Sequence, residues 1–407
     1  MNFSTLDFAI FIGYCVLIIA VGIWVSREKK GHIKNSTDYF LASKSLPWWA
    51  IGASLIASNI SAEQFIGMSG SGFAIGLGIA SYEFMAAATL IIVAKFFLPI
   101  YIKEGIFTMP QFLKLRYDDR IRTSLAIFWI MLYIFVNLTT VLYLSALALS
   151  VVFGVSTMWA IIGLAVVAVS YSIYGGLKAV AWTDVIQVVF LILGGLVTTF
   201  LALDAVSGGD GPMRGMAMLL EKAPEKFDMI LSKENPFYKD LPGMTVLFGG
   251  MWIANISYWG FNQYIVQRAL AAKSLKEVQW GLVFAAFLKL LIPLVVVIPG
   301  IAAFVLNAEI SRYDEAYPWL LSNLVPTGLK GLAFAALMAA ALSSLSSMMN
   351  STATIFTIDI YKAHLKPDAN EKQLVIIGRV VSLTAIIIAV MVAEPLLGGE
   401  EQIFQFI

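Results

Sequence analysis

The sequence predicts an all-α integral membrane protein, and three observations support that fold class. Of 407 residues, 59% are hydrophobic and only 13% are charged, whereas soluble domains carry about 25% charged residues. The mean hydropathy is +0.84. Uncharged apolar runs that approach or exceed the roughly 20 residues of a transmembrane helix recur along the whole chain. These properties exclude a soluble globular protein and identify the lipid bilayer as a partner.

The composition also excludes several functional classes. Lys+Arg 27 against Asp+Glu 26 gives a net charge of +1, so the chain has no field that would gather nucleic acid. A single cysteine, Cys15, and two histidines, His32 and His364, exclude a disulfide framework and disfavour a metal cluster. We find no nucleotide-binding glycine loop and no arrangement of nucleophile and base. The sequence therefore does not predict an enzyme.

The first apolar run, residues 8–25, is predicted to be a retained transmembrane helix. Asp7 precedes it and Arg27 follows it, whereas a cleavable signal peptide has basic residues before its apolar core. We therefore assign residues 1–30 to an extra N-terminal span whose N-terminus is outside. The remaining runs predict spans near residues 48–67, 78–101, 124–152, 158–174, 181–203, 244–266, 280–306, 331–358 and 375–392, and a last span begins near Gln402.

The orientation follows from the basic residues in the connections. When the spans are threaded alternately through the bilayer, most of the 27 Lys and Arg residues, including Arg268, fall on the cytoplasmic side. That excess agrees with the positive-inside rule. We expect a multi-pass protein of the inner or plasma membrane.

A polar stretch divides the spans into two groups. Residues 204–243 contain Gly208, Gly209, mixed charges and Asn235 before Pro236, which is typical of a loop. We expect this loop to be external, with one short surface helix. The stretch separates spans within residues 31–203 from spans within residues 244–407.

Four ionisable residues fall within or at the ends of apolar runs: Glu63, Glu83, Asp184 and Lys289. A charge at the bilayer centre costs at least about 2.5 to 3.5 kcal/mol, so such residues usually face a polar cavity or a partner. They are default candidates for a functional site. The alternative is a structural role, in which Lys289 pairs with a carboxylate or Glu83 is protonated.

Two apolar runs are interrupted by polar residues. The first contains Asn59, Ile60 and Ser61, and the second repeats that triplet at Asn255, Ile256 and Ser257. Interrupted helices in corresponding positions of two halves indicate the binding site of an inverted-repeat transporter, because unwound backbone in a membrane must line a cavity or hold a ligand. Chance is the rival explanation for so short a match.

A third polar feature follows Ala339 in the run 331–358. Ser343, Ser344, Ser346 and Ser347 form a stripe of small residues, which favours close helix packing. Beside the free carbonyls of a broken helix, the same hydroxyls would form an all-oxygen site for a hard cation such as Na⁺. Three aromatic residues flank these polar positions: Tyr82, Tyr258 and Trp259. They are candidates for the walls of a binding pocket; the alternative is that they only pack against neighbouring helices.

Seven strings of the sequence match one known family: residues 38–42, 44–50, 59–71, 171–177, 182–187, 258–264 and 350–360. Through them the sequence resembles the sodium/solute symporter family, and within it the bacterial sodium/galactose branch, which is similar to sodium/glucose cotransporters. The resemblance implies a leucine-transporter-like core of two inverted five-helix repeats. On this basis residues 31–203 form the first repeat and residues 244–407 form a C-terminally truncated second repeat that ends inside its last span.

The resemblance also implies roles for individual residues. It places sugar contacts at Gln64, Glu83, Asn255 and Lys289. It places an inner gate at Tyr258 and an outer gate at Met68, Tyr82 and Phe404. It assigns Na⁺ binding to the carbonyls of Ala57, Ile60 and Ala340 and the hydroxyls of Ser343 and Ser344, and a sodium exit route to Asp184.

The implied function is import of a hexose, galactose or glucose, coupled to Na⁺ and driven by alternating access. Ala86 departs from the sugar branch, which has a sugar-contacting serine at that position. A sodium symporter of another solute, such as a polyol, an amino acid or a sialic acid, is the nearest rival. A membrane sensor built on a transporter core is a rival of a different class.

Overall fold

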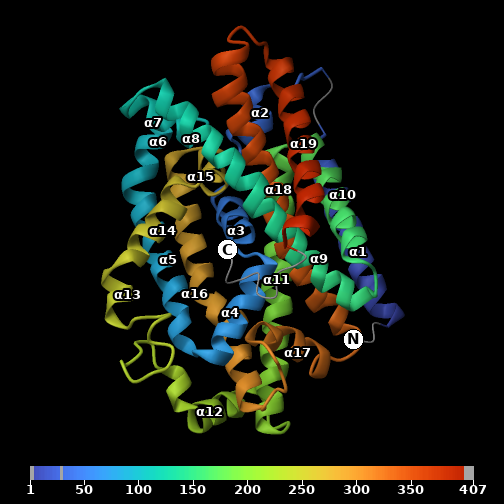
Figure 1. Cartoon of the computed structure of the whole chain (residues 1–407). Helices are drawn as coiled ribbons and strands as arrows, with labels where there is room; N and C mark the ends of the chain where they lie inside the picture. Colours follow the sequence, from blue (N-terminus) through green and yellow to red (C-terminus); the bar gives the residue numbers. More distant parts are fainter. Residues whose placement is uncertain (1–3, 28–30, 398–407) are drawn as a thin grey trace.

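A computed structural model describes residues 4–27 and 31–397 of the chain, and Figure 1 shows a bundle of helices with no strand in those ranges. The helices of the first half are α1 (Thr5–Val25), α2 (Ser36–Phe40), η1 (Ala42–Lys44), α3 (Trp48–Asn59), α4 (Ala62–Ala74), η2 (Leu77–Ala80), α5 (Ser81–Ile92), η3 (Val93–Phe97), α6 (Leu98–Glu104), α7 (Met109–Arg116), α8 (Asp119–Met131), η4 (Leu132–Leu138), α9 (Thr139–Phe153), α10 (Thr157–Gly175) and α11 (Leu177–Ser207).

The helices of the second half follow a connection that holds two of them. They are α12 (Pro212–Lys222), η5 (Pro224–Phe227), α13 (Met244–Phe248), α14 (Gly250–Phe261), α15 (Gln263–Leu270), α16 (Leu275–Val305), η6 (Tyr313–Glu315), α17 (Ala316–Asn323), α18 (Leu329–Ile355), η7 (Phe356–Leu365) and α19 (Glu371–Leu397). Three segments, η3, η4 and η7, are π-helical stretches inside longer helices.

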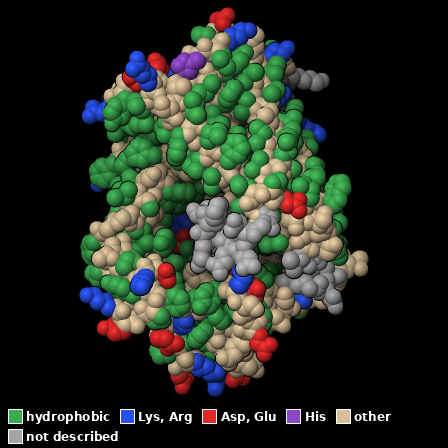
Figure 2. Space-filling view, in the orientation of Figure 1, with side chains coloured by type: hydrophobic (Ala, Val, Ile, Leu, Met, Phe, Trp, Pro, Cys, Tyr) green, Lys and Arg blue, Asp and Glu red, His purple; other side chains and the backbone are tan. Residues whose placement is uncertain are grey.

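The predicted membrane spans are confirmed within the described ranges. Eight continuous helices there are long and apolar enough to cross a bilayer, and the interrupted helices α3/α4 and α13–α15 supply the other two expected spans. The expected span beginning near Gln402 lies outside the described residues. In Figure 2 most visible charged side chains lie at the upper and lower ends of the molecule, with hydrophobic side chains on the band between.

The two interrupted helices run in opposite directions. In Figure 1, α3 lies above α4, whereas α15, the later half of the second interrupted helix, lies above α14. The first interruption is where the sequence predicts it, at Ile60, whose ψ of 104° ends α3. The second prediction is wrong in position: Asn255 and Ser257 lie inside regular α14, and the chain leaves the helix at Asn262, with ψ 124°.

Lys226, in the polar connection of residues 204–243, attaches this connection to the helix bundle. Its ammonium donates to the carbonyls of Phe73 at 2.9 Å and Ala74 at 2.6 Å, at the C-terminal end of α4, and lies 4.1 Å from the ring centroid of Phe304. Burial lowers the pKa of Lys226. A cation at a helix C-terminus is favourable, so this contact holds the connection against the second half of the first interrupted helix. The predicted short surface helix in this stretch corresponds to α12.

Close packing of α4 on α16 depends on a glycine. A methyl group at Gly300 of α16 would overlap the backbone carbonyl of Ser69 in α4. We therefore expect Gly300→Ala to lower the stability of the protein by about 1 to 3 kcal/mol through overpacking, seen as a lower melting temperature in detergent. Gly163→Ala in α10 is the control, because no atom lies within 4 Å of its added methyl, and equal melting of the two variants would contradict the expectation.

Candidate functional site at the helix interruptions

Three of the predicted site residues meet in one buried cluster. Lys289 in the middle of α16 donates from Nζ to Glu83 Oε2 at 2.5 Å. Gln64, at the start of α4, donates from Nε2 to Glu83 Oε1 at 2.6 Å. Glu83 and Lys289 are only 3% and 1% exposed, and the Lys289 ammonium lies 5.5 Å from the Trp259 ring centroid. Segments distant in sequence thus bring an acid, a base and an amide together.

The chemistry of this cluster suits a neutral hydroxylated ligand. A carboxylate only accepts hydrogen bonds, an ammonium only donates them, and a carboxamide does both. A hydroxyl group, which is both donor and acceptor, can bond to any of the three. Because the ammonium and the carboxylate balance each other, a charged ligand would leave one of them uncompensated at high cost.

The other residues predicted to contact sugar or to form gates do not join this cluster of Gln64, Glu83 and Lys289. Asn255 is buried in α14, but its Nδ2 donates to Met251 O at 3.0 Å in its own helix. Tyr82 is 43% exposed, and Met68 is partly buried against two hydrophobic clusters. The structure does not connect these three to Glu83 by a hydrogen bond within the described residues. Phe404 and the side chain of Glu63 lie outside the described part of the chain.

Tyr258 connects the two interrupted helices. Its hydroxyl accepts a hydrogen bond from Asn59 Nδ2 at 3.0 Å, at the end of α3. It also lies 2.5 Å from the hydroxyl of Tyr264 in α15. The side chain therefore links the end of α3 to both halves of the second interrupted helix, α14 and α15.

The predicted cation ligands lie around the end of α3. The last carbonyls of a helix have no partner within it, and α3 ends at Asn59, beside the carbonyls of Ala57 and Ile60. Ser344 Oγ of α18 already donates to Ser58 O at 3.3 Å. Ser343, Ser344 and Ala340 are fully buried, and they lie in α18, which packs on α3. These oxygens fit a hard cation that needs no carboxylate cluster.

Asp184 stands in a network of buried charges and hydroxyls. Ser54 Oγ donates to Oδ2 at 2.5 Å and Ser343 Oγ donates to Oδ1 at 2.6 Å. Arg268 of α15 approaches Oδ2 at 3.2 Å, and both charged side chains are 0% exposed. Arg268 Nε also donates to Ser54 Oγ at 2.7 Å, and the guanidinium bonds to Ser347. The network connects α3, α11, α15 and α18.

Arg268 is the residue of this network that sequence reasoning missed. The threading groups it with the basic residues at cytoplasmic ends of spans, but its side chain is completely buried. The signal that could have found it is Asp184, because a carboxylate at membrane depth requires a cation nearby.

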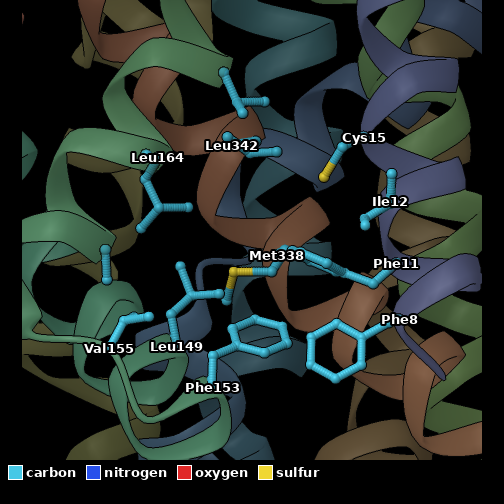
Figure 3. A pocket seen from close by; sticks show the side chains of 13 residues that line it. Phe8, Phe11, Ile12, Cys15, Leu149, Phe153, Val155, Leu164, Met338 and Leu342 are labelled. Carbon is cyan, nitrogen blue, oxygen red and sulfur yellow. The ribbon is translucent and has the colours of Figure 1, made fainter. Parts of the chain in front are cut away.

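The polar cluster is not at the roomier apolar cavity of the bundle. A cavity of about 490 Å³ lies between α1, α9, α10 and α18, and Figure 3 shows the side chains of Phe8, Phe11, Phe153 and Met338 around it. Its lining is aliphatic and aromatic apart from Cys15. Pockets for polar ligands need convergent polar groups, so this cavity does not qualify.

The chain is similar to known proteins over almost its whole length. A family model described as the sodium:solute symporter family matches residues 39–406. The chain is 56% identical to a sodium/glucose cotransporter of Vibrio parahaemolyticus, over 99% of this chain and 77% of that protein. It is 36% identical to the human sodium/myo-inositol cotransporter 2 over 97% of its length, and spans 62% of that relative.

The chain is also similar to a solved structure of a sodium-coupled transporter. A Na⁺-coupled sialic acid symporter, in a substrate-bound outward-open state, superposes with a TM-score of 0.87 at 26% identity, covering 98% of this chain and 84% of that one.

Proposed function

Since the chain belongs to the sodium:solute symporter family, we propose that it imports a hexose such as galactose or glucose together with Na⁺. The observation that carries the proposal is the buried cluster of Gln64, Glu83 and Lys289. An ion pair with an amide buried inside a membrane bundle is expensive to maintain and matches a neutral polyol. The 56% identical relative is named a sodium/glucose cotransporter, and the charge balance at the cluster disfavours the carboxylate of a sialic acid.

We assign sugar binding to Gln64, Glu83, Asn255 and Lys289. Sodium would be held by the carbonyls of Ala57, Ile60 and Ala340 and the hydroxyls of Ser343 and Ser344. The contact between Ser344 and Ser58 supports this assignment, since it already joins α18 to α3 at 3.3 Å. A cation at the same place would fix the first interrupted helix and orient Gln64, which follows the interruption.

The transport cycle follows from this coupling. Na⁺ stabilises the state that is open to the outside, with Met68, Tyr82 and Phe404 as the outer gate. Release of Na⁺ past Asp184 loosens the contact between α3 and α18, and the sugar leaves past Tyr258. Thermodynamic linkage requires that sugar tightens Na⁺ binding by the same factor by which Na⁺ tightens sugar binding.

We further propose that the protein resides in the inner or plasma membrane with its N-terminus outside. Residues 1–30 then form an extra span, residues 31–203 and 244–407 supply two inverted repeats, and residues 204–243 form an external connection. The opposite directions of the two interrupted helices support the inverted relation.

Uptake into proteoliposomes tests the function. Labelled galactose and glucose should accumulate when an inward Na⁺ gradient is present and should only equilibrate without it, while proline, the control, should not accumulate. Accumulation of proline, or sugar flux indifferent to Na⁺, would overturn the proposal.

The cation site has its own test in Ser344→Ala. Loss of one oxygen ligand should raise the Na⁺ concentration for half-maximal uptake about tenfold, as a loss of about 1.4 kcal/mol does. Thr352→Val, in the same helix, is the matched control, because the Thr352 hydroxyl bonds to Met348 O of its own helix. Uptake by Ser344→Ala with unchanged sodium dependence would remove Ser344 from the site.

A further inference from the structure

The apolar cavity of about 490 Å³ lies where α1 and α10 diverge. The two helices pack closely at one end, since a methyl group at Gly22 of α1 would overlap the side chain of Tyr171 in α10. Toward the N-terminal ends of both helices they separate. Gly163 of α10 lines the cavity there, and a methyl group added to it meets no atom within 4 Å. The cavity is therefore a wedge-shaped space between two membrane helices.

Aromatic side chains pack along one edge of this wedge. The ring centroid of Phe153 in α9 lies 5.2 Å from that of Phe8 and 5.4 Å from that of Phe11, both in α1. Phe334 of α18 lies 5.4 Å from Phe11 and from Phe153. Figure 3 shows Phe8 and Phe153 side by side below the open space. Because these rings pack on one another, they leave the space between α1 and α10 unfilled.

The cavity extends from the membrane-facing surface to the core of the bundle. Two of its lining residues, Ile12 of α1 and Val155 before α10, are 56% and 43% exposed. Two others, Met338 and Leu342 of α18, are each 1% exposed. Since α1 is apolar and long enough to span a bilayer, the medium around its exposed side chains is hydrocarbon. The cavity is thus continuous with the surface that the protein presents to lipid.

The lining of the cavity selects hydrocarbon as its occupant. None of the described residues that line it is charged, and the thiol of Cys15 is the most polar side chain among them. An apolar cavity of about 150 Å³ stays dry and binds benzene, and this one is roughly three times as large. Water and sugars lose hydrogen bonds on entering such a space. An empty space would forfeit dispersion contacts with its whole lining.

We propose that this cavity binds one acyl chain of a bilayer phospholipid, which enters between α1 and α10 and packs against α18. A flexible chain in the adjacent leaflet is already in hydrocarbon, so its binding needs no desolvation and is driven by close packing. The bound chain contacts Leu342, which directly precedes Ser343. Consecutive residues of a helix point about 100° apart, so the chain supports α18 on a face adjacent to that of Ser343.

Labelling by a photoreactive lipid tests the proposal in proteoliposomes. The probe is a phosphatidylcholine with a diazirine on its acyl chain, and labelled peptides are identified by mass spectrometry. Residues 333–355 of α18 are all buried, so lipids on the outer surface of the bundle do not reach them. We expect label at Met338 or Leu342 of the unmodified protein. Val166 of α10 is 61% exposed and is the reference for ordinary lipid contact.

Filling the wedge should remove the label from α18. Gly163→Phe is expected to lower the labelling of α18 by about tenfold or more relative to Val166, because a phenyl ring and an acyl chain do not fit in the same space. Gly163→Leu should give a smaller fall, and it keeps the test valid if Gly163→Phe does not fold. Gly13→Phe in α1 is the matched control, since Gly13 also has no atom within 4 Å of an added methyl but does not line the cavity.

Two outcomes would overturn the inference. Absence of label on α18 in the unmodified protein, with Val166 labelled, would show that the cavity is empty or is covered by something other than lipid, such as a second copy of the chain. Label on α18 that persists in both Gly163 variants would show that lipid reaches this helix by another route. The labelling needs neither sugar nor Na⁺, so either outcome leaves the proposed function intact.

Discussion

Lys289→Met is expected to abolish hexose uptake and to destabilise the protein. The substitution leaves the Glu83 carboxylate almost fully buried, with the Gln64 amide as the one hydrogen-bond donor that the described residues still give it. Removing one partner of a buried ion pair costs about 3 to 5 kcal/mol, because the other charge stays without compensation. The effect is measured as a drop in melting temperature in detergent and as loss of sodium-driven galactose accumulation in proteoliposomes.

The double variant Glu83→Gln with Lys289→Met separates folding from function. Without either charge, the pocket has no uncompensated ion, and replacing a buried pair by neutral groups is often nearly neutral for stability. We expect the melting temperature to recover while uptake stays absent, because the ammonium and carboxylate that we propose as sugar contacts are missing. Recovery of uptake would show that the pair is structural, and continued instability would show that its packing is the main contribution.

The spans of this fold are predictable from sequence because lipid enforces a simple rule. A run such as residues 8–25 has to be helical in a bilayer, since no water is present to satisfy its backbone, and α1 forms there. The interruption at Ile60 is also predictable, because polar residues inside an apolar run signal a break. The prediction from the triplet at Asn255 is wrong, because α14 stays regular through it and the chain leaves helical geometry only at Asn262.

The candidate site was predictable to the extent that it contains ionisable groups at membrane depth. Glu83 and Lys289 stand out in apolar runs, and the structure pairs them. Arg268 was not predictable in this way, because it lies near the end of a short polar helix where basic residues are expected.

Asp184→Asn is expected to have the second large effect. Asparagine keeps the shape of the side chain and can still accept from Ser343, but Arg268 loses its counter-charge at a position where both groups are 0% exposed. The cost for one unpaired buried charge is again about 3 to 5 kcal/mol. Lower melting temperature and lower sodium-driven uptake should appear together.

A second substitution decides what Asp184 does in transport. Asp184→Asn with Arg268→Gln removes both charges and should restore stability, because glutamine can still donate to Ser54. If Asp184 lies on the exit route, this variant should bind Na⁺ with unchanged affinity, measured by Na⁺-dependent galactose binding, while its maximal uptake rate falls about tenfold, a change of about 1.4 kcal/mol in the barrier to release. A lowered Na⁺ affinity would make Asp184 part of the cation site, since Ser343 bonds to Asp184 directly. An unchanged maximal uptake rate would show that the ion pair between Asp184 and Arg268 only stabilises the packing of α11 and α15.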